Sequence, residues 1–139
     1  MASTRLPRPP GNGARGFTLI ELLIVVSLIV VLATIGLATY HNSVQRGREA
    51  VLKEDLFRMR DAIDQHYADK GKYPASLEDL VAAGYLRSIP VDPITQSATT
   101  WQTVEAEPDP AKLTADPGIS NVKSGAEGQA LDGSNFSEW

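Results

Sequence analysis

An uninterrupted apolar segment near the N-terminus constrains this chain more than any other feature of its sequence. The 19 residues from Leu22 to Tyr40 carry no charge, and Glu21 is the one acidic or basic residue between Phe17 and Tyr40. As a helix, such a run extends about 28 Å, which is close to the thickness of the hydrocarbon core of a bilayer. The segment therefore predicts a single membrane-spanning helix.

The main alternative for this segment is a secretory signal peptide that is removed from the mature chain. The apolar region of such a peptide is normally about 7–15 residues long and ends at a small-residue cleavage site. This segment is longer, and no convincing A-x-A site follows it. Three basic residues precede the segment and four follow it closely, so the positive-inside rule does not decide its orientation.

Charge divides the chain at the start of the apolar segment. Residues 1–16 hold three arginines and no acidic residue, whereas the remainder holds 10 basic and 17 acidic residues, a net charge of −7. An acidic body disfavours nucleic-acid binding, because that affinity depends on Lys and Arg neutralising phosphates. The sequence has no cysteine, and it has no phosphate-binding loop, zinc-ligand spacing or nucleophile elbow. We therefore do not expect an enzyme.

The pattern after the apolar segment predicts that the same helix continues into a water-exposed domain. No proline occurs between Ser43 and Lys70. Apolar residues recur there every third or fourth position, at Leu52, Leu56, Met59, Ile63 and Tyr67. This spacing forms one apolar stripe, and Gly71 and Pro74 end the pattern. We expect one helix of about 54 residues, apolar all round in its first half and amphipathic in its second.

Shorter elements are expected in the rest of the chain. The run from Ser76 to Asp79 is like a capping box and Gly84 is a helix stop, so a short helix is expected between them. Thr99–Val104 is the best strand candidate and Ile119–Val122 is a weaker one. The prediction is an α+β fold, in which the second half of the long helix packs on a small C-terminal antiparallel sheet.

Glu21 is the residue that most needs an explanation. A carboxylate in the middle of a membrane span costs about 2.5–3.5 kcal/mol on insertion scales, and an acid kept in such a helix usually has a partner or a task. The alternative is that Glu21, near the start of the span, merely reaches the headgroup region.

The residues around Glu21 resemble the processing signature of the type IV pilin superfamily. The matching stretch is Arg15-Gly-Phe-Thr-Leu-Ile-Glu-Leu-Leu-Ile24. The resemblance implies that a membrane-embedded prepilin peptidase cuts after Gly16 and N-methylates Phe17, the new first residue. It also implies that Glu21 pairs with the terminal amine of a neighbouring subunit. That pair would set the register of helices in a homo-oligomeric filament, as a specificity device more than a stabiliser.

The same resemblance implies the pilin fold and a division of the chain into three parts. Residues 1–16 are the cleaved basic leader, and residues 17–40 are the transmembrane helix that later forms the filament core. Residues 41–139 are the periplasmic globular domain.

The second half of the chain is similar to the G-type major pseudopilin of type II secretion systems. The similar stretches are Lys72-Tyr-Pro-x-x-Leu-Glu-x-Leu80, Gly84-Tyr-Leu86 and Ile89-Pro-x-Asp-Pro93. Two features differ from that family: the apolar helix has no proline, and Asp92-Pro-Ile-Thr-Gln-Ser97 stands in place of a Trp-Gly-Asn-Pro stretch.

This resemblance implies a structural subunit of a periplasm-spanning pseudopilus, anchored in the bacterial inner membrane, that helps to export folded proteins across the outer membrane. Its partners would be minor pseudopilins and an inner-membrane assembly platform. One alternative is a major subunit of a type IV pilus for adhesion or motility, although many such pilins close a loop with two cysteines. An alternative of a different class is a single-span anchored periplasmic binding domain.

The resemblance to the major pseudopilins also implies a calcium ion in the C-terminal loop. The matching candidate ligands are Asp132, Ser134 and Glu127, with backbone carbonyls nearby, and calcium takes six to eight oxygens. The alternative is an ordinary turn with solvated side chains. Among other candidates, His41 and His66 would be about 37 Å apart on the long helix, too far to share a site, and each is expected at the surface or at an interface.

Overall fold

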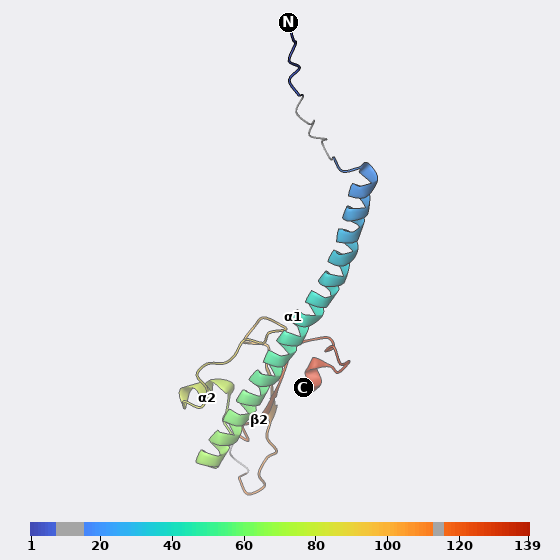
Figure 1. Ribbon diagram of the computed structural model, residues 1–139. Helices are drawn as coiled ribbons and strands as arrows, with labels where there is room; N and C mark the ends of the chain where they lie inside the picture. The colour runs from blue at the N-terminus through green and yellow to red at the C-terminus, as the bar shows by residue number, and fades with distance from the viewer. Residues whose placement is uncertain (8–15, 113–115) are drawn as a thin grey trace. The chain divides into compact units, whose positions relative to one another are not determined.

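A computed structural model describes residues 1–7, 16–112 and 116–139 of the chain. The helices are α1 (Leu19–Lys70), α2 (Leu77–Ala82) and a short 3-10 helix, η1 (Phe136–Glu138), and the strands are β1 (Gln102–Glu105) and β2 (Ile119–Lys123) (Figure 1). One long helix and a two-stranded antiparallel sheet confirm the predicted α+β fold. Residues 8–15 of the predicted leader, which include Arg8 and Arg15, lie outside the described residues.

The chain separates into two compact units, Met1–Ala38 and Thr39–Trp139. The structure does not test the predicted boundaries at residues 16 and 40, which stay predictions. In the first unit, every described side chain of the apolar part of α1 is exposed. Exposed fractions of its large apolar side chains run from 44% at Val25 to 89% at Leu19. Each Å² of apolar surface left in water loses about 25 cal/mol of the stabilisation that burial would give. This segment therefore requires an apolar environment that the described residues of its unit do not supply.

Hydroxyl groups in this part of α1 are satisfied by the helix itself. Ser27 Oγ donates to the Leu23 carbonyl at 2.7 Å, and Thr34 Oγ1 donates to the Val30 carbonyl at 2.8 Å. Such bonds to the preceding turn leave no hydroxyl proton in need of water. By length and composition, α1 is the one helix of the described residues able to cross a membrane. The chain is therefore compatible with a single-pass membrane-anchored protein.

The second unit builds its core on the predicted stripe of α1. Leu52, Leu56, Met59 and Ile63 are at most 2% exposed, as expected from their spacing. The end of the stripe was predicted wrongly, because Tyr67 is 47% exposed whereas the neighbouring His66 is 4% exposed. The prediction that His66 lies at the surface or at an interface is corrected in the same way: the turn after α1 folds back over the His66 ring and buries it within the chain.

The short helix α2 has the caps that its sequence predicted. Ser76 Oγ accepts a hydrogen bond from the Asp79 N–H at 3.3 Å. At the other end, the Tyr85 N–H donates to the Leu80 carbonyl at 2.9 Å, and Gly84 adopts a φ of +82°. This is a Schellman motif, which favours glycine at the left-handed position.

The two strands pair antiparallel, with Thr103 opposite Val122 and a register shift between Val104 and Glu105. The first strand begins three residues later than predicted. Trp101, which was expected within the strand, is 9% exposed and donates from Nε1 to the Pro90 carbonyl at 2.8 Å. This hydrogen bond holds the Trp101 side chain toward the core, so the pairing of β1 with β2 begins at the next residue, Gln102.

Arg60 on α1 links this helix to β2 through hydrogen bonds. Its Nε donates to Asn121 Oδ1 at 2.8 Å, and its Nη2 donates to the Val122 carbonyl at 2.9 Å. A planar guanidinium can make both bonds at once. The sheet is therefore held on the helix by polar contacts as well as by the buried side chains of Ile119 and Val122.

Candidate functional site

The candidate processing and assembly site lies where α1 begins. Thr18 immediately precedes the first helical residue, and its Oγ1 accepts a hydrogen bond from the Glu21 N–H at 3.2 Å. The Leu22 N–H donates to the Thr18 carbonyl at 3.1 Å, which closes the first turn. A threonine followed three residues later by a glutamate is the sequence pattern of a capping box. The sequence interpretation missed Thr18, although it used the same signal at Ser76.

The cap at Thr18 leaves Gly16 and Phe17 outside the helix. Both residues are exposed, and the Phe17 side chain keeps 83% of its surface accessible. A Cβ atom built on Gly16 would meet no heavy atom within 4 Å. The described fold therefore makes no steric demand for glycine at this position. A demand for glycine would have to come from a macromolecule that binds this segment.

Glu21 is exposed in the first turn of α1. A negative charge there interacts favourably with the positive end of the helix dipole. Within the residues that the structure describes, the one ion pair joins Arg58 to Glu54 at 2.9 Å. The Glu21 carboxylate thus has no cationic partner in the described part of its own chain.

The residues predicted to hold calcium are only partly brought together. Asp132 Oδ1 accepts hydrogen bonds from the Ser134 N–H at 2.9 Å and from Ser134 Oγ at 2.6 Å. These bonds hold the pKa of the exposed Asp132 carboxyl below its usual value. Ser134 Oγ also accepts a bond from Trp139 Nε1 at 2.7 Å. Glu127 is exposed, and no hydrogen bond or ion pair in the described residues joins it to either.

The side chains of Asp132 and Ser134 alone do not complete a calcium site, so backbone carbonyls would have to supply most of the ligands. One carboxylate and one hydroxyl are brought together, whereas calcium takes six to eight oxygens. Among the described residues, there is no cluster of three or more His, Cys, Asp or Glu side chains that could hold a metal. Calcium binding stays a prediction, and the geometry resembles the alternative, a turn closed by its own hydrogen bonds.

The C-terminal segment docks on α1 through two further contacts. The Leu131 N–H donates to Glu49 Oε1 at 2.9 Å, and Lys53 Nζ lies 4.3 Å from the centroid of the Trp139 ring. An ammonium over an indole face is attracted by the ring quadrupole. Trp139 also packs edge-on against Phe136, with ring centroids 5.2 Å apart. Trp139 therefore has a packing role in the C-terminal segment.

Asp92 is a buried carboxylate that the sequence analysis named only within stretches compared with the major pseudopilins. Its Oδ1 accepts the N–H groups of Ile94 and Thr95 at 2.8 and 3.3 Å, and its Oδ2 accepts the hydroxyl of Ser124 at 2.6 Å. Three donors satisfy a carboxylate that has no exposed surface. Burial raises the pKa of the nearby Asp55 carboxyl; Arg58 opposes the shift, and the charge of Asp92 adds to it.

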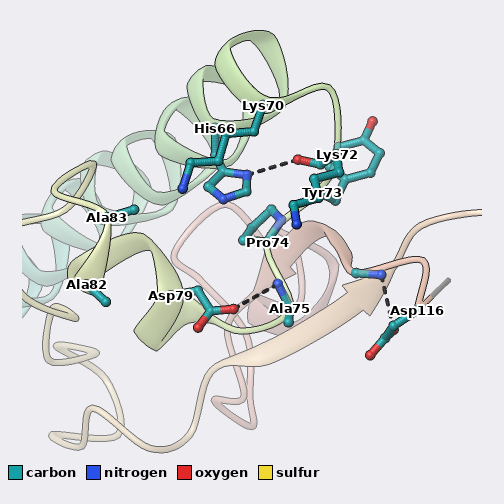
Figure 2. Close-up of a pocket in the computed structure, with 11 residues that line it drawn as sticks. His66, Lys70, Lys72, Tyr73, Pro74, Ala75, Asp79, Ala82, Ala83 and Asp116 are labelled. Carbon is teal, nitrogen blue, oxygen red and sulfur yellow. Dashed lines mark hydrogen bonds between the residues drawn. The ribbon is translucent and has the colours of Figure 1, made fainter.

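A pocket of about 570 Å³ lies beside the C-terminal end of α1 (Figure 2). His66 Nδ1 donates to the Lys72 carbonyl at 2.9 Å, and the ring meets Tyr85 edge-on with centroids 5.4 Å apart. The charged side chains of the pocket are Lys70, Lys72, Asp79 and Asp116. His66 therefore supports the turn after α1, and the residues lining the pocket do not include a nucleophile paired with a base.

Comparison with known proteins places these features in context. The family model "Prokaryotic N-terminal methylation motif" matches residues 11–37. The type II secretion system core protein G of Klebsiella pneumoniae is 28% identical over 95 residues, covering 57% of this chain and 68% of that protein. The fimbrial protein EcpC of Eikenella corrodens is 37% identical over 75 residues, covering 54% and 47%. A type IV major pilin, PilE1 of Neisseria gonorrhoeae, is 36% identical over 62 residues, covering 43% and 36%.

The chain thus spans about half the length of the fimbrial protein and about a third of that of the pilin. No solved structure gives a significant match. The methylation motif covers the start of α1, where Gly16, Phe17, Thr18 and Glu21 lie. The motif and these relatives confirm the resemblance predicted from the sequence: the chain is pilin-like, and it resembles the G-type core proteins of type II secretion systems.

Proposed function

We propose that this chain is a structural subunit of a type II secretion-type pseudopilus, a helical filament that helps to export folded proteins across the outer membrane. One observation supports this most: an exposed Gly16–Phe17 bond precedes a helix whose apolar side chains are left uncovered by the described residues of their unit. A segment of that kind can be cut at its start and can then pack against copies of itself.

Processing by prepilin peptidase is the first step of the proposal. The bond after Gly16 lies outside helical structure, where a protease can bind it in extended form. Cleavage removes the basic leader and leaves Phe17 with a cationic amine, which the same enzyme methylates. Because the described fold does not itself require glycine at residue 16, the requirement belongs to the peptidase.

Assembly is the second step. The Phe17 amine of one subunit and the Glu21 carboxylate of the next would both be buried among apolar helices. Each charge offsets the desolvation of the other, and a mispaired register would leave a charge buried alone. We infer that this pair sets the axial register of subunits that are anchored in the inner membrane, with residues 41–139 in the periplasm and minor pseudopilins and an assembly platform as partners.

A type IV pilus subunit is the second candidate. It is supported by the similarity to a fimbrial protein and to a pilin, which are the relatives of higher identity. The secretion-type proposal is favoured because the similarity to core protein G extends over about two thirds of that protein. Neighbouring genes for a secretion ATPase and a secretin would separate the two candidates. An anchored periplasmic binding domain would need neither cleavage nor assembly.

The mass of the intact, membrane-extracted protein tests the proposal. We expect a product that begins at methylated Phe17, and we expect Gly16→Ala to retain the leader. Gly47→Ala is the matched control, because a Cβ atom there also meets nothing within 4 Å, and it should be cut normally. An uncut wild-type chain that begins at Met1, or cleavage after Tyr40, would contradict the proposal.

A further inference from the structure

Two opposite charges stand unpaired on the part of α1 that follows the apolar run. Arg46 lies near the start of this part and Asp64 near its end, and both side chains are exposed. The one ion pair within the described ranges joins Arg58 to Glu54. Neither Arg46 nor Asp64 therefore has an ionic partner in those ranges.

Arg46 and Asp64 lie on the same side of α1. The 18 positions between them correspond to five full turns and to about 27 Å along the helix axis. The buried stripe that forms the core is rotated from their common line by about 80–140°. Three further exposed residues lie within about 40° of this line, namely Ala50, Phe57 and Ala68. We call the side of α1 defined by these five residues its exposed face.

Two other basic residues lie beside the exposed face, and each already has a contact within its own chain. Lys53 Nζ lies 4.3 Å from the centroid of the Trp139 ring. The guanidinium of Arg60 donates hydrogen bonds to Asn121 and to the backbone of β2. Arg46, by contrast, is held by no hydrogen bond or ion pair within the described residues, so it is available to a second copy.

Copies anchored at the same depth in a membrane bring like charges level with each other on this face. Arg46 then lies level with Arg46, and Asp64 lies level with Asp64. Such like-charge contacts oppose association. If one copy is displaced by about 27 Å along the helix axis, its Arg46 instead lies level with Asp64 of the other copy. The exposed face therefore disfavours pairs at equal depth and favours pairs displaced by five turns.

The remaining charges of α1 are compatible with this displacement. Among the Asp, Glu, Lys and Arg residues from Arg46 to Lys70, Asp64 is the one for which the residue 18 positions earlier is also charged. Asp61, one turn before Asp64, adds a second exposed negative charge about 60° around the helix. Phe57 comes level with residue 39, at the end of the apolar run of the displaced copy. The displacement therefore brings opposite charges together and creates no like-charge contact along the helix.

We propose that Arg46 of one copy pairs with Asp64 of a second copy that is displaced by about 27 Å along α1. An exposed ion pair adds little affinity by itself, but complementary charges fix register and exclude wrong partners. The contact rests on the proposed function, because it needs an assembled filament. A subunit of a helical filament has neighbours at several axial displacements, so this pair and the Phe17–Glu21 pair join different neighbours.

Cysteine crosslinking tests the displacement, because the chain has no native cysteine. Ala50 and Ala68 are exposed and are also 18 positions apart. In sheared filaments of the full processed chain, A50C/A68C treated with a short thiol crosslinker should give a ladder of covalent oligomers. A50C alone and A68C alone should not exceed dimers. The matched control is T39C/A50C, whose positions are 11 residues, or about 16 Å, apart on the same side, and it should give no ladder.

Processing and filament yield are recorded on the same samples. Processed protein and abundant filaments without an A50C/A68C ladder would overturn the contact and leave the proposed function intact. A ladder from T39C/A50C in its place would overturn the displacement. The absence of filaments from the wild-type chain would overturn both the contact and the proposed function.

Charge exchange provides a second test. R46D and D64R should each lower filament yield several-fold at equal membrane levels of processed protein, and R46D/D64R should restore most of it. The matched control is R48D, which changes an exposed arginine about 160° around the helix from Arg46 and should assemble normally. A double variant no better than the single variants would contradict the ion pair.

Discussion

Asp92 Oδ2 and Ser124 Oγ lie 2.6 Å apart, and neither residue has any exposed surface. The bond joins the loop after α2 to the segment after β2, across 32 positions of the chain. Ser124 Oγ also accepts the Ala126 N–H at 3.1 Å. One hydroxyl therefore links a buried carboxylate to the start of the C-terminal loop.

Removing that hydroxyl should destabilise the second unit. Ser124→Ala leaves the Asp92 carboxylate without one of its three donors, and an unsatisfied buried group costs about 1–3 kcal/mol, more when it is charged. Denaturant unfolding of the detergent-solubilised full chain, followed by tryptophan fluorescence, measures the change. Ser137→Ala, at an exposed position, should stay within about 0.5 kcal/mol of wild type. Equal effects of the two substitutions would show that the buried bond is not important for stability.

Asp55 should make the stability fall with rising pH in the acid range. Its pKa is raised in the folded state, chiefly by burial, so the unfolded chain loses this proton at a lower pH than the folded chain does. The stabilisation that the protonated Asp55 carboxyl gives the folded state is complete below the ordinary carboxyl pKa of about 4. It is lost as the pH rises through the raised pKa of the folded state.

Asp55→Asn removes this titration. The free energy of unfolding of the variant, relative to wild type, should therefore increase from about pH 4 upward and then level off. Asp61→Asn is the control, because Asp61 is exposed on the same helix. A difference between Asp55→Asn and wild type that does not vary with pH would contradict the role assigned to burial.

Glu21 should affect assembly without affecting cleavage. Glu21→Gln keeps the size of the side chain but leaves the Phe17 amine buried without its counter-charge, and losing one partner of a buried pair costs about 3–5 kcal/mol. Filament yield should then fall at least about 100-fold, while the mass of the processed chain shows normal cleavage. Glu54→Gln breaks only the exposed pair with Arg58 and should leave the yield unchanged. Normal filament yield from Glu21→Gln would rule out the pairing.

The C-terminal loop should keep its stability when calcium is removed. Asp132 and Ser134 supply two oxygens, and their hydrogen bonds to each other and to Trp139 already close the turn. We expect the same unfolding midpoint in calcium and in chelator. A rise in the midpoint with calcium that Asp132→Asn abolishes would instead confirm the calcium site that the resemblance implies.

Features that depend on near neighbours in the chain could be predicted from the sequence. The helix from Leu19 to Lys70 follows from an apolar run, a three-and-four spacing and the absence of proline, and α2 follows from its caps at Ser76 and Gly84. The motif at Gly16 and Glu21 is equally local, and the Thr18 cap could have been predicted from the same signal.

Features that depend on packing between distant segments could not. The Trp101 bond to Pro90 delays β1 until Gln102, and the turn after α1 buries His66 in place of Tyr67. The sequence by itself determined a single apolar helix with one carboxylate at its start. Charge depends only on residue type, and helical periodicity depends on residues three or four positions apart. Only the tertiary structure decided the burial of Asp92 against Ser124, because it depends on which distant segments meet after the core has formed.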